Sequence, residues 1–299
     1  MIRLLGATAI TGPVISRGTT AGAASSKVIK IGYVSSQTGV SAPAAQADPF
    51  ILDQIRAGLA NGITNGGVNY EVQIISKDSQ SNTNRASAVA TELIFKNKVD
   101  LLVTSDAPDT TNAVADQAEA NEVPCITCMT PWQPYFFGRH GTADKGFTWT
   151  YHFFWGLEDI IAAYLALWES VETNKVVGNL FPNDMDGNSW ADAKSGFPPA
   201  LQEAGYKLID TGRFQPFSDD FGSQISAFKS GGVEIVTGAI ITPDFTTFWN
   251  QAAQQGFKPK VVTVGKALIF PASIAALGRR ADGLSTEIRG RQAIHLDRD

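Results

Sequence analysis

Short apolar runs alternate with amphipathic segments along most of this 299-residue chain. The runs have the length of buried strands, and the segments between them carry apolar residues at helical spacing. This alternation predicts an α/β fold with parallel sheets. The first run, 27–34, ends in the polar residues Ser35, Ser36 and Gln37. Open α/β sheets bind their ligands at the carboxyl ends of the strands, so we expect a binding site there.

The alternation forms two series, and two sheets of similar build are more economical than one very wide sheet. The predicted strands of the first series are 28–34, 71–76, 100–104, 123–127 and 148–153, and its predicted helices are 49–64, 83–97 and 108–121. The second series has predicted strands at 175–180, 207–211, 234–238 and 261–264, and predicted helices at 157–172, 189–204, 220–229 and 244–255. The chain is therefore predicted to form two Rossmann-like lobes with parallel central sheets.

The lobes are expected to meet at a ligand cleft. We assign 27–150 to the N-terminal lobe and 151–288 to the C-terminal lobe. The aromatic segment 147–155 lies between the two series and is predicted to be the first connection between the lobes.

The first 26 residues are typical of a targeting segment. Arg3 precedes an apolar stretch, 4–15, and small residues at 21–25 fit a signal-peptidase site. We expect export, which places the protein in the periplasm or outside the cell. A disordered N-terminal tail is the alternative.

Composition and missing motifs argue against several classes of function. The net charge is −5 and no basic surface interleaved with aromatic residues is visible, so nucleic acid is not an expected partner. No stretch after the N-terminal segment reaches the roughly 18 apolar residues of a membrane-spanning helix. The serine-elbow, phosphate-loop and dinucleotide-binding glycine motifs are absent, so we expect neither an enzyme nor a bound cofactor.

Cys125 and Cys128 lie on one predicted strand. Residues three apart in a strand point to opposite faces, so we expect two packed thiols rather than a disulfide or a shared metal. His140, His152 and His295 are scattered without the spacing of a zinc site, and no metal is expected.

Five segments carry a family resemblance: Val-Ile-Lys-Ile-Gly-Tyr-Val-Ser-Ser-Gln-Thr-Gly at 28–39, and then 78–86, 123–131, 201–206 and 249–257. In order and spacing they resemble the branched-chain amino-acid type of ABC-transporter solute-binding proteins, the Leu/Ile/Val-binding family with the type I periplasmic fold. The resemblance implies two lobes that close on a small molecule like a Venus flytrap. It also implies delivery of that molecule to an ABC permease in the membrane.

In the family, the loops after three strands of the first lobe hold the carboxylate and backbone of the ligand. The matching residues here are Ser35, Ser36, Gln37, Ser105, Asp106, Met129 and Thr130. Pro108 suits the first turn of a helix whose free N–H groups would favour a carboxylate. The alternative is that the hydroxyl groups only cap helices. The charge of Asp106 opposes a bound carboxylate unless its side chain points away or caps the helix.

The second lobe is expected to supply the closing side of the cleft. Its candidate residues are Trp155, Asp186, Thr242 and Lys266. Amino-acid-binding members of the family usually have an acidic residue near the position of Lys266. A lysine there departs from that pattern and suits a carboxylate or an aromatic acid, on which Trp132, Tyr151 and Trp155 could stack. A solvated lysine at the rim and aromatic residues in the core are the alternatives.

The predicted function is that of an extracytoplasmic solute-binding component of an ABC importer for a small amino acid, amide, or aromatic or organic acid. A ligand-sensing receptor or regulator on the same fold is the alternative. Family members continue with further strands and helices beyond Leu284, whereas the segment 289–299 is charged and lacks an apolar period. We therefore expect an aberrant tail and a C-terminally truncated reading frame.

Overall fold

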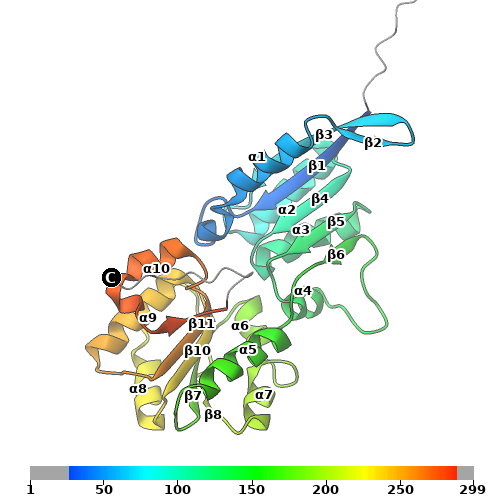
Figure 1. Ribbon diagram of the computed structural model, residues 1–299. Helices are drawn as coiled ribbons and strands as arrows, with labels where there is room; N and C mark the ends of the chain where they lie inside the picture. Colours follow the sequence, from blue (N-terminus) through cyan, green and yellow to red (C-terminus); the bar gives the residue numbers. More distant parts are fainter. Residues whose placement is uncertain (1–26, 288–299) are drawn as a thin grey trace, which may run out of the picture.

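The computed structural model describes residues 27–287, so the predicted targeting segment and the predicted aberrant tail lie outside the described residues. Two six-stranded sheets form the frame of two lobes (Figure 1). The first sheet has the order β2-β3-β1-β4-β5-β6, and the second has the order β12-β11-β10-β7-β8 with β9 paired to β7. We name the part of the chain built on the first sheet the first lobe, and the part built on the second sheet the second lobe.

The strands of the first lobe are β1 (Lys27–Ser35), β2 (Ile63–Asn65), β3 (Val68–Asp78), β4 (Leu101–Ser105), β5 (Cys125–Cys128) and β6 (Thr150–His152). Those of the second lobe are β7 (Val176–Pro182), β8 (Lys207–Ile209), β9 (Arg213–Phe214), β10 (Ile235–Ile240), β11 (Val261–Lys266) and β12 (Leu284–Ser285). Every pair is parallel except the β2–β3 hairpin. Parallel pairing requires crossovers, and helices supply most of them.

The helices of the first lobe are η1 (Ala42–Ala45), α1 (Asp48–Gly58), α2 (Thr83–Glu92), the π-helical η2 (Leu93–Asn97), α3 (Pro108–Ala120) and α4 (Trp132–Gly138). The second lobe contains α5 (Leu157–Glu169), α6 (Met185–Trp190), α7 (Phe197–Glu203), α8 (Gly222–Gly231), α9 (Thr242–Gln254), α10 (Pro271–Leu277) and η3 (Gly278–Ala281). Of the helices between residues 27 and 287, none combines the length and the hydropathy that crossing a bilayer requires.

The second sheet is buried on both faces. On one face Val236 and Val264 pack with Phe228 and Phe248 of α8 and α9. On the other face Val177, Phe181 and Ile235 pack with α5 and α7 residues that include Trp168 and Phe197. Because neighbouring residues of a strand point to opposite faces, a strand covered on both sides is apolar throughout. The burial of every residue of β10 agrees with this rule.

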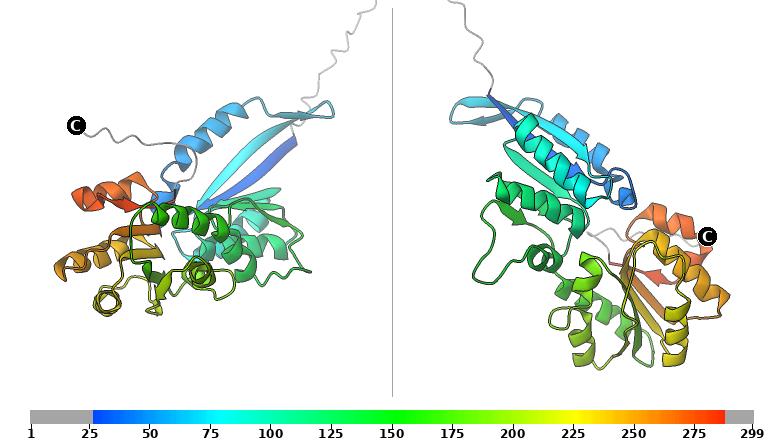
Figure 2. Two further views of the ribbon diagram at one scale, coloured as in Figure 1. Left: turned by 60° about the horizontal axis from the view of Figure 1, so that its bottom comes forward. Right: turned by 180° about the vertical axis from the view of Figure 1, so that it is seen from behind.

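The first sheet is covered more unevenly. Helices α2 and α3 pack on one face, where Val34, Leu102 and Cys125 are fully buried. The right-hand view of Figure 2 shows these two helices on the near side of the sheet and α1 on its far side. The opposite face leaves Ile126 and Tyr151 exposed by 45% and 62%. The described part of the chain therefore covers one face of this sheet completely and the other only in part.

Most predicted elements are present, but two predicted helices are wrong in extent. The helix predicted over 49–64 ends at Gly58, and a hairpin turn through Gly66 and Gly67, both with positive φ, follows it. The helix predicted over 189–204 is two helices, α6 and α7. The backbone turns between them because Asp192 accepts hydrogen bonds from the N–H groups of Lys194 and Ser195. Both thiols are free, as predicted: Cys125 is buried and Cys128 half-buried.

Replacing Gly238 with Ala should destabilise the second lobe. A Cβ atom at this buried position of β10 would lie 2.4 Å from the backbone oxygen of Leu180 in the neighbouring strand. Relief of that overlap requires a backbone shift, and we expect the free energy of unfolding to fall by about 1–3 kcal/mol. Gly58→Ala is the matched control, because a Cβ there has open space around it. Urea unfolding measures both variants, and equal stabilities would contradict the close strand approach.

Candidate functional site

A cavity of about 90 Å³ lies between the lobes, which is room for several water molecules or part of a small ligand. On the first-lobe side it is lined by segments that follow β1, β4 and β5, among them Ser41, Pro43, Ala107, Pro108, Met129 and Pro131. The second lobe contributes Trp155, Asp186, Trp190, Thr242, Lys266 and Glu287, among others. The carboxyl ends of the strands of the two sheets thus face each other (Figure 1). The cavity between them has a largely apolar wall.

The structure divides the predicted site residues into two groups. Those that line the cavity are Met129, Trp155, Asp186, Thr242 and Lys266. Those that do not line it are Ser35, Ser36, Gln37, Ser105, Asp106 and Thr130. Most of the second group is buried in the first lobe, whereas Gln37 is exposed and donates from its side-chain amide to Ser76 near the end of β3.

Asp106 directs its carboxyl group into the first lobe, away from the cavity. It is 1% exposed and accepts hydrogen bonds from Ser36 Oγ, from Ser79 Oγ at 3.0 Å and from the N–H of Ala107 at 2.8 Å. Burial raises the pKa of Asp106 above its ordinary value, although these hydrogen bonds oppose the shift. The carboxyl group of Asp106, whose charge would oppose a bound carboxylate, is therefore hydrogen-bonded by donors of the protein itself.

His152 holds the loop after β5 in place. Its Nε2 donates to the backbone oxygen of Thr130 at 2.8 Å, and its Nδ1 lies 2.8 Å from Thr127 Oγ1. Its ring stacks on Tyr135 with centroids 4.3 Å apart. Burial lowers the pKa of His152, which favours a neutral ring with the proton on Nε2. The neighbouring Met129, at a φ of 69°, is positioned in the cavity wall by this anchored loop.

Lys266 is engaged by acidic side chains. Its ammonium forms ion pairs with Asp186 and, at 3.4 Å, with Asp184. Burial opposes the charge of Lys266, but the carboxylates of Asp186 and Asp184 outweigh it and raise the pKa of Lys266. Burial raises the pKa of Asp186 above its ordinary value despite the nearby ammonium. Lys266 is thus half-buried rather than a solvated rim lysine, and its charge is already balanced.

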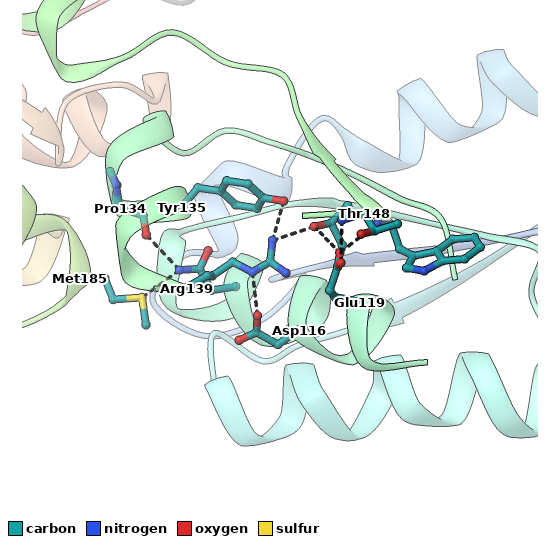
Figure 3. Close-up of polar contacts among 10 residues, drawn as sticks. Asp116, Glu119, Pro134, Tyr135, Arg139, Thr148 and Met185 are labelled. Atoms are coloured by element: carbon teal, nitrogen blue, oxygen red, sulfur yellow. Dashed lines mark hydrogen bonds and ion pairs between the residues drawn. The ribbon is translucent and has the colours of Figure 1, made fainter. Parts of the chain in front are cut away.

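Polar contacts also join the two lobes. Asp109, in the first turn of α3, accepts a hydrogen bond from the N–H of Met185 in α6, and it interacts electrostatically with Lys266. Asn112 Nδ2 donates to the backbone oxygen of Pro134 at 3.0 Å and contacts Met185 Sδ at 3.3 Å (Figure 3). These contacts hold α3 and α4 of the first lobe against α6 of the second.

A buried guanidinium supports the chain just before it leaves the first lobe. Arg139 donates to Asp116, to Tyr135 Oη and to Thr150 Oγ1 at 2.6–2.8 Å (Figure 3). Glu119 accepts hydrogen bonds from the N–H groups of Thr148 and Trp149. Burial opposes the charge of Glu119, but these hydrogen bonds outweigh burial and lower its pKa. The network fixes the start of β6 against α3 and α4.

Sequence reasoning missed several residues of the site. Ser41 and Pro43 lie after the predicted loop, directly before and within the 3₁₀ turn η1, and Glu287 lies beyond the last predicted strand. Phe270 lines the cavity directly before Pro271, a first-turn proline that could have signalled the start of α10. Tyr135 is one helical turn from Arg139, but Asp116 and Thr150 lie 23 and 11 residues away, and no local pattern joins these partners.

Replacing Arg139 with Met should destabilise the first lobe by about 2–4 kcal/mol, because buried hydroxyl groups lose their donor and Asp116 loses its cation. Arg56→Met is the matched control: Arg56 and its partner Asp53 are exposed by 46% and 72%, and such pairs contribute little. Chemical unfolding followed by circular dichroism compares the two. Similar small losses of unfolding free energy in both variants would show that the Arg139 network does not stabilise the first lobe.

Asp244 makes the stability of the protein depend on pH. It is 2% exposed in the first turn of α9, and burial raises its pKa to about 6 against hydrogen bonds from Phe217 and Ser218. The folded chain retains this proton where the unfolded chain has lost it, so the contribution of Asp244 to stability falls as pH rises from about 4 to about 6.

An Asp244→Asn variant lacks this titration. Relative to the wild type, its free energy of unfolding should therefore rise between about pH 4 and about pH 6.5, by on the order of 2 kcal/mol. Urea unfolding at the two pH values gives the difference between the proteins. A difference that stays constant, or that falls as pH rises, would exclude a raised pKa at Asp244.

Comparisons with known proteins agree with this geometry. Residues 28–287 match the family described as periplasmic binding protein. The leucine binding protein LivK of Thermotoga maritima is 21% identical, with 86% of this chain and 68% of that chain covered and a TM-score of 0.67. An extracellular ligand-binding receptor of Rhodopseudomonas palustris HaA2 is 17% identical, with coverages of 87% and 67% and a TM-score of 0.66.

A solute-binding protein of an ABC transporter from R. palustris, solved in complex with 4-hydroxybenzoate, is 19% identical. The alignment covers 80% of this chain and 61% of that chain, with a TM-score of 0.64. At such identities the likeness shows the fold, and the predicted two-lobed type I periplasmic fold is confirmed. The match is to a family of binding proteins and not of enzymes. It covers most of the chain, which therefore belongs to the periplasmic binding protein family.

Proposed function

We propose that this chain is the exported solute-binding component of an ABC importer. The proposal rests on one observation: residues of both lobes line the same cavity, at the carboxyl ends of both sheets. A solute in that cavity touches both lobes at once, so its binding energy favours the closed arrangement over an open one. A clamp of this kind suits a protein that captures a solute and hands it to a permease.

The order of events follows from where the contacts lie. In an open arrangement the loops after β1, β4 and β5 receive the solute, and the second lobe then brings Trp155, Asp186 and Lys266 over it. Closure also forms the polar contacts of Asp109 and Asn112 with Met185. Exclusion of water strengthens every polar contact made inside the closed cavity.

The solute is proposed to be a small organic molecule. The R. palustris protein was solved with 4-hydroxybenzoate, and the Streptococcus pneumoniae protein LivJ, 18% identical to this chain, was solved with isoleucine. Amino acids, amides and aromatic or organic acids are therefore the first classes to test. The proposed partners are this solute and the membrane subunits of an ABC permease, and the proposed location is the periplasm or the cell exterior.

A thermal-shift screen of the purified chain tests the proposal, with amino acids, amides, aromatic acids and amines as ligands. A solute at about 100 times its Kd stabilises the folded state by about 2.7 kcal/mol, which should raise Tm by about 5 °C or more. Calorimetry then measures the stoichiometry, which should be one solute per chain. A folded protein that responds to no compound of the screen would contradict solute binding.

Trp155 should report the binding, because its ring lines the cavity. We expect the bound solute to change the intrinsic fluorescence of the wild type, and Trp155→Phe to lose at least half of that change. Trp249→Phe is the control: Trp249 stacks on Phe245 and donates to the backbone oxygen of Arg280, outside the cavity wall. An undiminished fluorescence change in Trp155→Phe would show that the solute does not lie against this ring.

A further inference from the structure

The charges around the cavity are not balanced. Among the described residues that line it, Asp186 and Glu287 are acids and Lys266 is the one base. The ammonium of Lys266 is already paired with Asp186 and Asp184, and it also interacts with Asp109. A ligand carboxylate would meet a cation that is already neutralised, together with acids that repel it.

The donors near the N-terminus of α3 are also in use. The N–H of Ala107 and the hydroxyls of Ser36 and Ser79 all donate to Asp106, which is 1% exposed. Asp109 adds a second carboxyl group in the first turn of the same helix. A helix N-terminus with adjacent hydroxyls could otherwise hold a ligand anion. Here those hydroxyls are held by Asp106, whose carboxyl group points away from the cavity, and neither Ser36 nor Ser79 lines the cavity.

The rest of the cavity suits an apolar body. Its wall contains aliphatic side chains together with the rings of Trp155, Trp190 and Phe270. The ring centroids of Phe154 and Trp155 lie 4.1 Å apart. Aliphatic and aromatic walls enclose apolar groups, and the faces of aromatic rings attract cations.

We propose that the cavity takes a solute with a positively charged nitrogen on an apolar body, such as an alkylamine or arylalkylamine, and that the pairing of Lys266 with Asp186 and Asp184 makes it reject carboxylates. This inference rests on the proposed function, since it names the ligand class of the same cavity. The nitrogen lies beside Asp186 and Glu287. Among the described residues, Glu287 accepts hydrogen bonds from Tyr164 and Thr286 at its Oε2, and its Oε1 is the proposed acceptor for the ligand.

Calorimetry on the full chain with matched pairs tests the ligand class. Phenethylamine is compared with 3-phenylpropionate, and isoamylamine with 4-methylpentanoate, since each pair shares its apolar body. At least one amine should bind ten or more times as tightly as its acid. An acid that binds as tightly as its amine overturns the inference.

The wider screen separates this inference from the proposed function. If an amino acid or an aromatic acid binds while no amine binds, the proposed ligand class is wrong and the proposal of solute binding stands. If no compound binds in either the thermal-shift screen or the matched pairs, solute binding itself is contradicted, and so is the inference.

Two variants locate the selectivity. Asp186→Asn should weaken amine binding about tenfold, whereas Asp53→Asn, which loses the same charge on the exposed surface of α1, should bind as the wild type does. Equal amine affinity in the two Asn variants overturns the inference.

Discussion

A strand can pair in parallel with its neighbour only if the chain crosses over and enters the sheet again from the same end. Every loop that leaves a carboxyl end then emerges on one edge of the sheet, whatever its sequence. In this protein two such edges face each other, and the walls of the cavity are the loops that emerge there. The position of the site is thus a consequence of backbone pairing, and the side chains decide only what the site accepts.

Those side chains include several buried ionisable groups, and each is compensated locally. Asp106 is surrounded by donors of its own lobe, Arg139 by hydroxyls and a carboxylate, and Lys266 by Asp186 and Asp184. An uncompensated charge in such positions would cost several kcal/mol, so removal of one partner is more damaging than the absence of both. This compensation means that a charged residue near the cavity cannot be assumed to be available to a ligand.

The fold was predictable because its signals are local. The apolar run that became β1, the proline at the start of α3 and the helical spacing of α9 can each be read within one segment. The break between α6 and α7 depended on the backbone contacts of Asp192, which no periodicity reveals. At the site, sequence could place Lys266 near the end of its strand but could not show its pairing with Asp186, because distant segments meet there only after folding. The inward turn of Asp106 escaped prediction for the same reason.

Within residues 27–287 the backbone passes from the first sheet to the second once, between β6 and α5. A single covalent crossing limits the distance between two bodies but leaves their relative rotation largely free. The direction in which the lobes face each other is then set by non-covalent contacts such as that of Asn112 with Met185. Binding of a solute between the lobes would fix their relative orientation, and this ordering would reduce the net free energy of binding. A variant that stiffened this crossing could therefore bind more tightly without gaining a contact.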